Sequence, residues 1–291
     1  MAVYLTLWVG IRLLGRLPLR VLYGLADGVS TLMWYGSPRL QRVTVDHMLR
    51  VSGGAATPRR HARAARGSVR SAGRYWADMA RAAHLPGGEA LDRLEAVEGI
   101  EHFFEAFDAG CGVLFVSAHL GNPETLMRGM GSLGFDVLVL TEPLSPPRLH
   151  ELVHTVRQAP GVHFVPADRS GVRLALEQLR AGGIVAMLAD RDVLGTARPR
   201  PFFGAPARLP NGAVELALRT NAKIVTGFAR RTRGNRMRVT LDRPIELQRS
   251  GDRVADVEAG MERLTHALEA GIGRTPEQWF ALQPVWDGPA S

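Results

Sequence analysis

Short apolar runs that alternate with helical segments constrain the fold of this chain more than any other feature of its sequence. Val-Leu-Phe-Val at 113–116 and Val-Leu-Val-Leu at 137–140 are apolar without interruption, which is typical of strands buried on both faces. Segments with helical spacing separate such runs. We expect strands at 113–118, 137–141, 162–165, 184–189 and 223–229, and helices at 124–133, 146–158, 172–180 and 211–220. The alternation predicts βαβ crossovers, and therefore an α/β fold with a mainly parallel central sheet flanked by helices.

Four further segments lie outside this alternation. Residues 94–97 are expected to form a short first strand, and 100–109 a helix that Gly110 ends. After the last crossover, 237–241 favours an antiparallel partner strand and 253–270 a helix. In open parallel sheets the ligand crevice lies beyond the carboxyl ends of the strands. Side chains that directly follow strands are therefore the first candidates for a functional site.

The start of the chain is apolar but interrupted by arginine. The uninterrupted apolar run at 1–11 is about half of the roughly 20 residues that a membrane-spanning helix needs. It lacks the positive start and the small-residue cleavage site of a secretory signal. We expect amphipathic helices instead, with Pro18 opening the second one. Trp8, Trp34 and Tyr35 suit a lipid interface, and packing of these helices on the core is an equal and compatible alternative.

Charge and cysteine content narrow the possible partners. Lys and Arg number 36 against 28 Asp and Glu, so the formal net charge is +8. A basic surface suits an anionic membrane, a phosphorylated substrate or a nucleic acid. We expect two parts: membrane-associating helices at 1–50 and an α/β domain at 51–286. The first helix of that domain, from Thr57, carries a row of arginines, which we interpret as a solvated face. Cys111 is single, so no internal disulfide can form.

One histidine is well placed for acid–base chemistry. His119 directly follows an expected strand, and Glu124 lies five residues later. Gly121 permits a tight turn, while Asn122 and Pro123 suit the start of a helix, so the Glu124 carboxylate can reach the imidazole. A carboxylate that fixes the ring tautomer leaves the other nitrogen free to accept a proton. The sequence therefore predicts a general base for an alcohol; in the alternative, Glu124 meets the helix dipole and His119 is a polar turn residue.

A second polar segment directly follows another expected strand. Asp190 and Asp192 flank Arg191 there, and one of the two carboxylates is a candidate second partner for His119. The alternative is a local Asp–Arg salt bridge that shapes the loop. Farther along, the aromatic segment 202–204 is a candidate wall of a substrate pocket, or else a part of the core beneath a long loop.

The two segments together resemble a known family of acyltransferases. Ser117-Ala-His119-Leu-Gly-Asn-Pro-Glu124 is similar to the His-x4-acid signature of glycerolipid-type acyltransferases, and more narrowly to the branch of the lipid A late acyltransferases and the actinobacterial phosphatidylinositol mannoside acyltransferases. The second segment is similar to the Asp-Arg-Asp…Phe-Phe-Gly…Pro-x-Gly block of that branch, at 190–192, 202–204 and 210–212. The resemblance extends from about Arg12 to Trp279. Pro123 stands where this branch commonly has Trp.

The resemblance implies transfer of a fatty acyl chain from a thioester donor, acyl-CoA or acyl carrier protein, to a hydroxyl of a membrane lipid or glycolipid. The arginine-rich composition favours a phosphatidylinositol mannoside-type acceptor, whereas Glu at position 124 favours a lipid A-type (lauroyl or myristoyl) enzyme. No cofactor, metal, nucleic acid or covalent acyl-enzyme is expected, and the sequence has no nucleophile elbow. The implied location is the cytoplasmic face of the plasma membrane, as a peripheral protein. A non-enzymatic basic protein that binds membranes or nucleic acid is the remaining alternative.

Carried onto this chain, the resemblance gives its residues roles. His119 would deprotonate the hydroxyl and Glu124 would support it. Arg157, or the backbone amides near Gly121, would stabilise the oxyanion at the thioester carbonyl; for Arg157 the alternative is a plain surface arginine. The predicted catalytic residues are His119, Glu124, Arg157, Asp190 and Asp192, and the predicted substrate contacts are Gly121, Asn122, Arg191, Phe202, Phe203 and Gly204.

Overall fold

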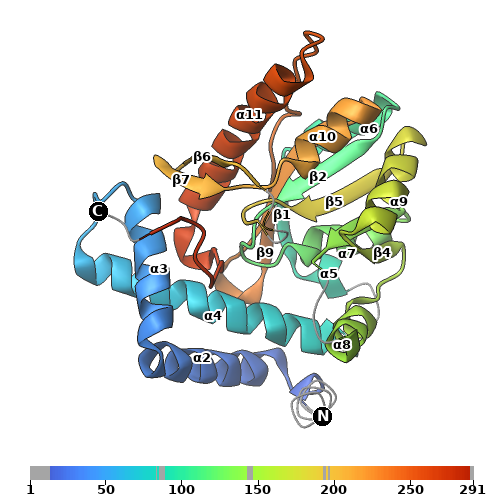
Figure 1. Ribbon diagram of the computed structural model, residues 1–291. Helices are drawn as coiled ribbons and strands as arrows, with labels where there is room; N and C mark the ends of the chain where they lie inside the picture. The colour runs from blue at the N-terminus through green and yellow to red at the C-terminus, as the bar shows by residue number, and fades with distance from the viewer. Residues whose placement is uncertain are drawn as a thin grey trace.

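A seven-stranded sheet in the order β1-β9-β8-β2-β5-β3-β4 forms the centre of the molecule (Figure 1). The computed structural model describes residues 14–82, 84, 89–142, 147–192, 195 and 197–288. From β8 to β4 neighbouring strands are parallel, β9 is antiparallel to β8, and β1 is parallel to β9. The predicted mainly parallel α/β sheet and its antiparallel partner strand are therefore confirmed. The strands are β1 (Leu94–Glu98), β2 (Val113–Ser117), β3 (Val137–Thr141), β4 (Val162–Pro166), β5 (Ile184–Leu188), β8 (Lys223–Arg231) and β9 (Met237–Leu241).

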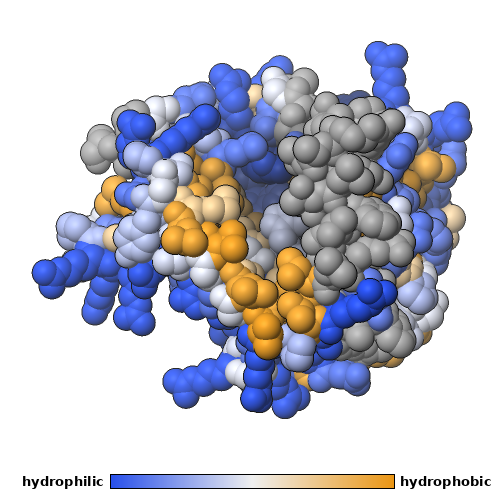
Figure 2. Space-filling view, turned by 90° about the horizontal axis from the view of Figure 1, so that it is seen from below, coloured by the Kyte–Doolittle hydropathy of each residue, from blue (hydrophilic) through white to orange (hydrophobic). Residues whose placement is uncertain are grey.

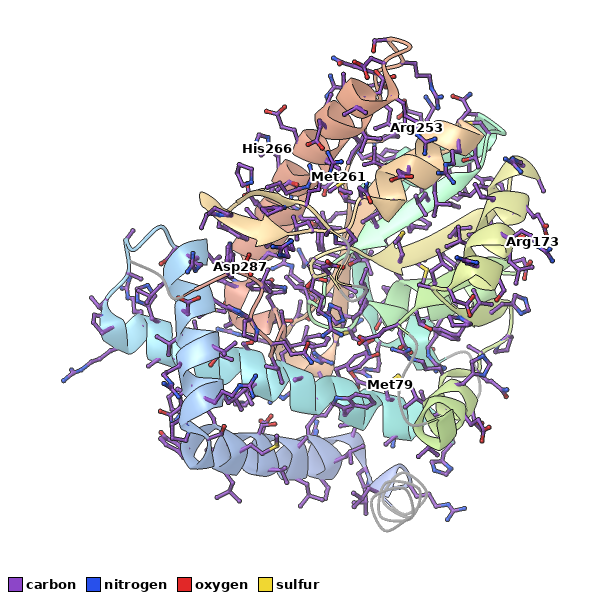
Figure 3. The ribbon with its side chains drawn as sticks, in the orientation of Figure 1. Met79, Arg173, Arg253, Met261, His266 and Asp287 are labelled. Carbon is purple, nitrogen blue, oxygen red and sulfur yellow. The ribbon has the colours of Figure 1, made fainter. Side chains whose placement is uncertain are left out.

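Helices cover both faces of this sheet. One face packs on α6 and α7 through Phe103, Met127 and Met130, and the other packs on α9, α10 and α11. On α11, Met261 is fully buried and His266 is exposed, and Figure 3 shows the latter pointing away from the sheet. The helices are α5 (Glu89–Asp92), α6 (Ile100–Asp108), α7 (Glu124–Ser132), α8 (Pro147–Arg157), α9 (Arg169–Arg180), α10 (Gly212–Thr220) and α11 (Arg253–Arg274).

A small hairpin, β6 (Pro199–Phe202) and β7 (Ala205–Arg208), was not expected from the sequence. Both strands contain proline, which normally argues against a strand. The two-residue turn holds Phe203 at φ 48° and Gly204 at φ 74°. Positive φ at both central positions is the geometry that suits a two-residue hairpin, and a phenylalanine gives no sequence signal for it.

Before α5 and the first strand, the described part of the chain forms the long helices α2 (Leu19–Gly36), α3 (Pro38–Val51) and α4 (Pro58–Ala82). Figure 1 shows α2 and α4 side by side below the sheet. Trp34 and Met48 are buried in the same cluster as the sheet residues, so these helices pack on the core, while Tyr35 stays exposed. The helix expected before Leu17 and its Trp8 lie mostly outside the described residues. No helix in the described ranges is long and apolar enough to cross a bilayer.

The arginines of α4 do more than form the solvated face that we predicted. Arg70 and Arg74 both bind the Asp27 carboxylate on α2, at 2.8 and 2.6 Å. The helices approach closely where Gly73 faces α2, because a Cβ there would lie 2.2 Å from the Ser30 hydroxyl oxygen. The sequence pattern showed the arginine row but could not show the aspartate, which lies 43 and 47 positions earlier in the chain.

Candidate active site

His119 and Asp190 form a close pair at the carboxyl edge of the sheet. Strands β2 and β5 are parallel neighbours with Ser117 opposite Leu188, so the residues two positions later meet at the same edge. The His119 Nδ1 atom lies 2.7 Å from Asp190 Oδ1. The other carboxylate oxygen accepts hydrogen bonds from the His119 backbone N–H (3.0 Å) and from the Trp279 indole N–H (2.8 Å). Of the two aspartates considered, the structure therefore places Asp190 on the ring.

The electrostatics of this pair favour a charged carboxylate beside the imidazole. The Asp190 side chain has no exposed surface, whereas 21% of the His119 side chain is exposed. Burial raises the pKa of Asp190, but the neighbouring His119 and the hydrogen bonds from His119 and Trp279 outweigh it and lower that pKa to about 2. An ionised acceptor at Nδ1 fixes the tautomer with the proton on that nitrogen. The Nε2 atom is then the position that can accept a proton.

Glu124 does not support the imidazole, in contrast to our prediction. Its Oε1 atom accepts from the Tyr75 hydroxyl at 2.7 Å and lies 2.7 Å from Arg157 Nε. The structure shows no hydrogen bond or ion pair between Glu124 and His119, both of which are described residues. The reason is that α7 begins at Glu124, and its first turn directs this buried side chain toward α4 and α8.

Tyr75 is a site residue that sequence analysis missed. Its hydroxyl donates to Glu124 and accepts from Arg157 Nη2 at 2.7 Å. Burial and the adjacent Glu124 raise the pKa of Tyr75, so the phenol stays protonated. Its ring stacks on Phe280, which in turn meets the His119 ring edge-on at 5.8 Å between ring centres. Tyr75 sits in an arginine-rich helix far from either motif, so nothing local marks it.

The turn after His119 is fixed by its own backbone. The Gly121 N–H donates to Gln278 O at 3.0 Å, and the Asn122 N–H donates to Ala229 O at 2.9 Å. Gly121 has φ 59°, and a Cβ at this position would lie 2.1 Å from Ala229 O, so only glycine fits. Both amides that we considered as oxyanion donors are therefore already engaged. The structure therefore does not favour them over Arg157 as oxyanion donors.

Trp279 and Phe280, which follow α11, contact the site residues, and these contacts were not predicted. Leu120 forms an antiparallel bridge with Trp279, and the Phe280 N–H donates to His119 O at 2.7 Å. Trp279 is completely buried and packs against His47 with ring centres 5.1 Å apart. The chain beyond α11 thus returns to hold both the histidine backbone and the aspartate carboxylate.

The remaining predicted residues lie around this centre. Asp192 accepts from the Gly195 and Ala197 amides and so shapes its own loop. Arg191 pairs with the Glu142 carboxylate and donates to Gln283. No hydrogen bond or ion pair joins Asp192 to His119 in the described part of the chain.

The aromatic segment belongs mainly to the core. Phe202 has no exposed surface and stacks on Trp286 with ring centres 5.6 Å apart, which favours the alternative that it packs in the core. Phe203 is partly exposed, and with Gly204 it forms the hairpin turn.

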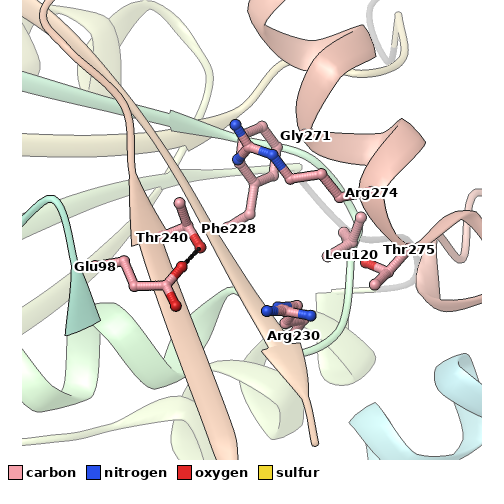
Figure 4. A pocket seen from close by; sticks show the side chains of 8 residues that line it. All are labelled: Glu98, Leu120, Phe228, Arg230, Thr240, Gly271, Arg274 and Thr275. Atoms are coloured by element: carbon pink, nitrogen blue, oxygen red, sulfur yellow. Dashed lines mark hydrogen bonds between the residues drawn. The ribbon is translucent and has the colours of Figure 1, made fainter. Parts of the chain in front are cut away.

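A pocket of about 270 Å³ is lined in part by Leu120, the residue after His119 (Figure 4). Leu120 and Thr275 form one wall, and Phe228, Thr240 and Arg230 form another. Leu120, which directly follows His119 in the chain, is almost completely buried.

Comparison with known proteins places the chain among lipid acyltransferases. The family described as bacterial lipid A biosynthesis acyltransferase matches residues 1–287. A phosphatidylinositol mannoside acyltransferase of Mycobacterium tuberculosis (strain CDC 1551 / Oshkosh) is 28% identical over 228 residues, which are 75% of this chain and 69% of that protein. The phosphatidylinositol mannoside acyltransferase of Mycolicibacterium smegmatis is 27% identical over 231 residues, 76% of this chain and 71% of that protein.

Proposed function

The chain belongs to the bacterial lipid A biosynthesis acyltransferase family and is an O-acyltransferase, and we propose that it acylates a hydroxyl of a phosphatidylinositol mannoside-type glycolipid. The single observation that carries the proposed chemistry is the His119–Asp190 pair at the strand edge, with Nδ1 engaged and part of the ring exposed. The similarity to two mycobacterial enzymes of that name supports the acceptor class.

In the proposed reaction His119 is the general base. Its Nε2 takes the proton of the acceptor hydroxyl as the oxygen attacks the thioester carbonyl, and the charge of the resulting imidazolium is balanced by Asp190. The tetrahedral intermediate collapses with cleavage of the C–S bond. The leaving thiolate takes the proton back from the imidazolium, which regenerates the neutral base. A positioned base of this kind contributes roughly 10²–10⁴-fold to the rate.

Arg157 is the proposed donor to the oxyanion. Glu124 and Tyr75 hold its guanidinium through Nε and Nη2, and Nη1 has no hydrogen bond to any described residue. Its side chain is 20% exposed. Preorganised donors of this type contribute several kcal/mol, on the order of 3, to acyl transfer. Glu124 then acts by holding the arginine rather than the histidine.

We also propose that α2 docks on an anionic membrane. Its outward side chains Val21, Leu25, Val29, Leu32 and Met33 are 48–75% exposed and share one face of the helix. Figure 2 shows apolar side chains gathered on this underside of the molecule, with hydrophilic groups around them. A contiguous apolar face of this kind marks an interaction surface.

Charge near both ends of α2 favours a lipid surface over another protein as its partner. Arg16 and Arg20 are exposed at one end, Arg39 is exposed just past the other, and the outward face between them carries no charge. Leu25→Glu is expected to weaken binding to anionic vesicles at least tenfold. Val254→Glu, at an apolar position on α11 that is more exposed than Leu25, is the matched control and is expected to bind as the parent does. Unchanged binding of the Leu25 variant would contradict the docking face.

Acceptor identity is decided by direct assay. The purified protein is incubated with acyl-CoA or acyl carrier protein and with either a phosphatidylinositol mannoside or a lipid A precursor, and products are read by mass spectrometry. We expect one added acyl group on the phosphatidylinositol mannoside. Transfer to the lipid A precursor alone would establish the second candidate, which the description of the matching family favours.

A further inference from the structure

The inward face of α2 carries a tyrosine that reaches the centre of the molecule. Tyr23 is 3% exposed, and its hydroxyl donates to Asp78 Oδ1 at 2.5 Å. The same hydroxyl accepts from Arg93 Nη2 at 2.7 Å. Tyr23 is thus joined to α4 and to the start of β1, although the helix that carries it presents an apolar face to the outside.

Asp78 connects Tyr23 to the turn at 120–123, which follows His119. Besides Tyr23, its carboxylate accepts from Arg93 (2.8 Å), Arg231 (2.7 Å) and the Asn122 side-chain amide (3.0 Å). The Asn122 amide oxygen accepts in turn from the Glu124 N–H at 3.1 Å. One buried carboxylate therefore sets the orientation of the residue that starts α7, the helix of Glu124.

Arg231 makes the second connection to the turn. Its Nη1 atom donates to Gly121 O at 2.8 Å, while its backbone N–H and C=O pair with the Gln278 side chain at 2.7 and 2.8 Å. The same Gln278 accepts from the Gly121 N–H through its own carbonyl. Gly121 is therefore held on both sides by groups that Asp78 and Arg231 position.

Such a cluster is not explained by stability alone. Asp78 and Arg231 are 6% and 9% exposed, and buried ion pairs commonly contribute little net stability compared with apolar residues of similar volume. What a fully bonded buried network does provide is one geometry for the groups that it contacts. Here those groups are the two residues that follow the His119–Leu120 segment.

We propose that Tyr23 and Asp78 are positioning residues for acyl transfer, which makes α2 part of the catalytic framework as well as the lipid-facing helix. This inference rests on the proposed acyl transfer. Tyr23 completes the set of donors around Asp78, and Asp78 holds Asn122 and Arg231 so that the turn keeps His119 and Arg157 in register with each other. Neither residue touches the reacting atoms.

The test is Tyr23→Phe, which removes one hydroxyl and keeps the ring. Tyr35→Phe is the matched control, because Tyr35 lies on the same helix and its exposed hydroxyl accepts one hydrogen bond, from Arg66, among the residues that the structure describes. We expect kcat to fall on the order of tenfold in Tyr23→Phe, since small misplacements of reacting groups are costly. The KM for the acyl donor and the midpoint of the pH–rate profile are expected to stay unchanged, and vesicle binding is expected to match the parent. Equal kcat in both variants would overturn the proposal.

Hydrogen exchange of the peptide that covers 120–123 supplies a readout that needs no activity. Its amides are expected to exchange several-fold faster in Tyr23→Phe than in Tyr35→Phe, because the turn loses part of its support. Faster exchange without loss of kcat would contradict the positioning role, and unchanged exchange would contradict the connection itself. If the parent protein transfers no acyl group, the proposed function fails while the exchange measurement still decides whether α2 holds the turn. Asp78→Asn is expected to change both readouts in the same direction and further.

Discussion

A His–Asp pair lies at each end of the strands of the central sheet, and the two pairs have the same separation. At the carboxyl edge His119 Nδ1 lies 2.7 Å from Asp190, and at the amino edge His163 Nε2 lies 2.7 Å from Asp136. The first aspartate has no exposed surface, whereas the side chains of the second pair are 62% and 64% exposed. The distance between the atoms is therefore not what distinguishes them.

The surroundings of each pair explain the difference. Asp190 accepts two further hydrogen bonds at Oδ2, from the His119 backbone and the Trp279 indole, so that together with the Nδ1 contact at Oδ1 both of its oxygens are engaged. The Asp136–His163 pair is exposed to solvent, where ion pairs contribute little to stability. A buried, fully bonded carboxylate holds one tautomer of the ring, and an exposed one does not. Equivalent changes at the two pairs are therefore expected to have very unequal effects.

Removal of the ring should produce the largest contrast. His119→Ala is expected to lower kcat for acyl transfer by about 10³-fold or more, because the general base is lost. His163→Ala removes the exposed histidine and is expected to retain activity within about twofold. Steady-state rates with both variants, together with circular dichroism to confirm the fold, decide the matter. Comparable losses in the two would show that the strand-edge histidine has no special role.

The carboxylates provide the next contrast. Asp190→Asn is expected to reduce kcat by roughly 10²-fold, because an amide can turn its N–H toward Nδ1 and favour the wrong tautomer. Asp136→Asn is the matched control at the other edge and is expected to leave kcat unchanged. The KM for the acyl donor should not move in either variant. A fully active Asp190→Asn enzyme would mean that the buried acid orients nothing.

The sequence allowed the strand edge to be predicted but not all of its contacts. Apolar runs identified β2 and β5, and polar residues directly after both strands pointed to His119 and Asp190 as neighbours. Glu124 was assigned to the wrong partner, because its proximity along the chain says nothing of where the first turn of α7 points. Its partners in the structure, Tyr75 and Arg157, lie 49 and 33 residues away in the chain.

Contacts between residues far apart in the chain could not be predicted from the sequence. Trp279 reaches Asp190 across 89 positions, and Tyr23 reaches Asp78 across 55. Both are aromatic residues with a polar tip that would be assigned to the core, or to a lipid interface, on composition alone. The hairpin at Phe203 was not predicted for a different reason, since phenylalanine rarely adopts a positive φ and gives no sequence signal for such a turn.

Glu124 differs from both aspartates because its main ion-pair partner is Arg157, which stays charged at every pH of interest. Glu124→Gln is expected to lower the free energy of unfolding by about 3 kcal/mol, because Arg157 keeps its charge in a largely buried place. Activity should fall about tenfold through displacement of Arg157, while the pH dependence governed by His119 keeps its midpoint. Urea unfolding and a pH–rate profile measure the two effects. A shifted midpoint would place Glu124 on the imidazole after all.

Acid unfolding provides the smallest and most specific contrast between the two pairs. The hydrogen bonds and the neighbouring His119 lower the pKa of Asp190 from its usual 3.8 to about 2 in the folded protein. Because this pKa is lowered on folding, the stabilisation is complete above the unfolded value and is lost as the pH falls from about 4 to about 2. The shift corresponds to about 2 kcal/mol. Asp190→Asn should therefore lose about that much less stability than the parent between pH 5 and pH 2.5, as measured by urea unfolding at both pH values. Asp136→Asn should follow the parent, because an exposed pair gains little from folding; an equal change in both variants would mean that burial of Asp190 does not control its titration.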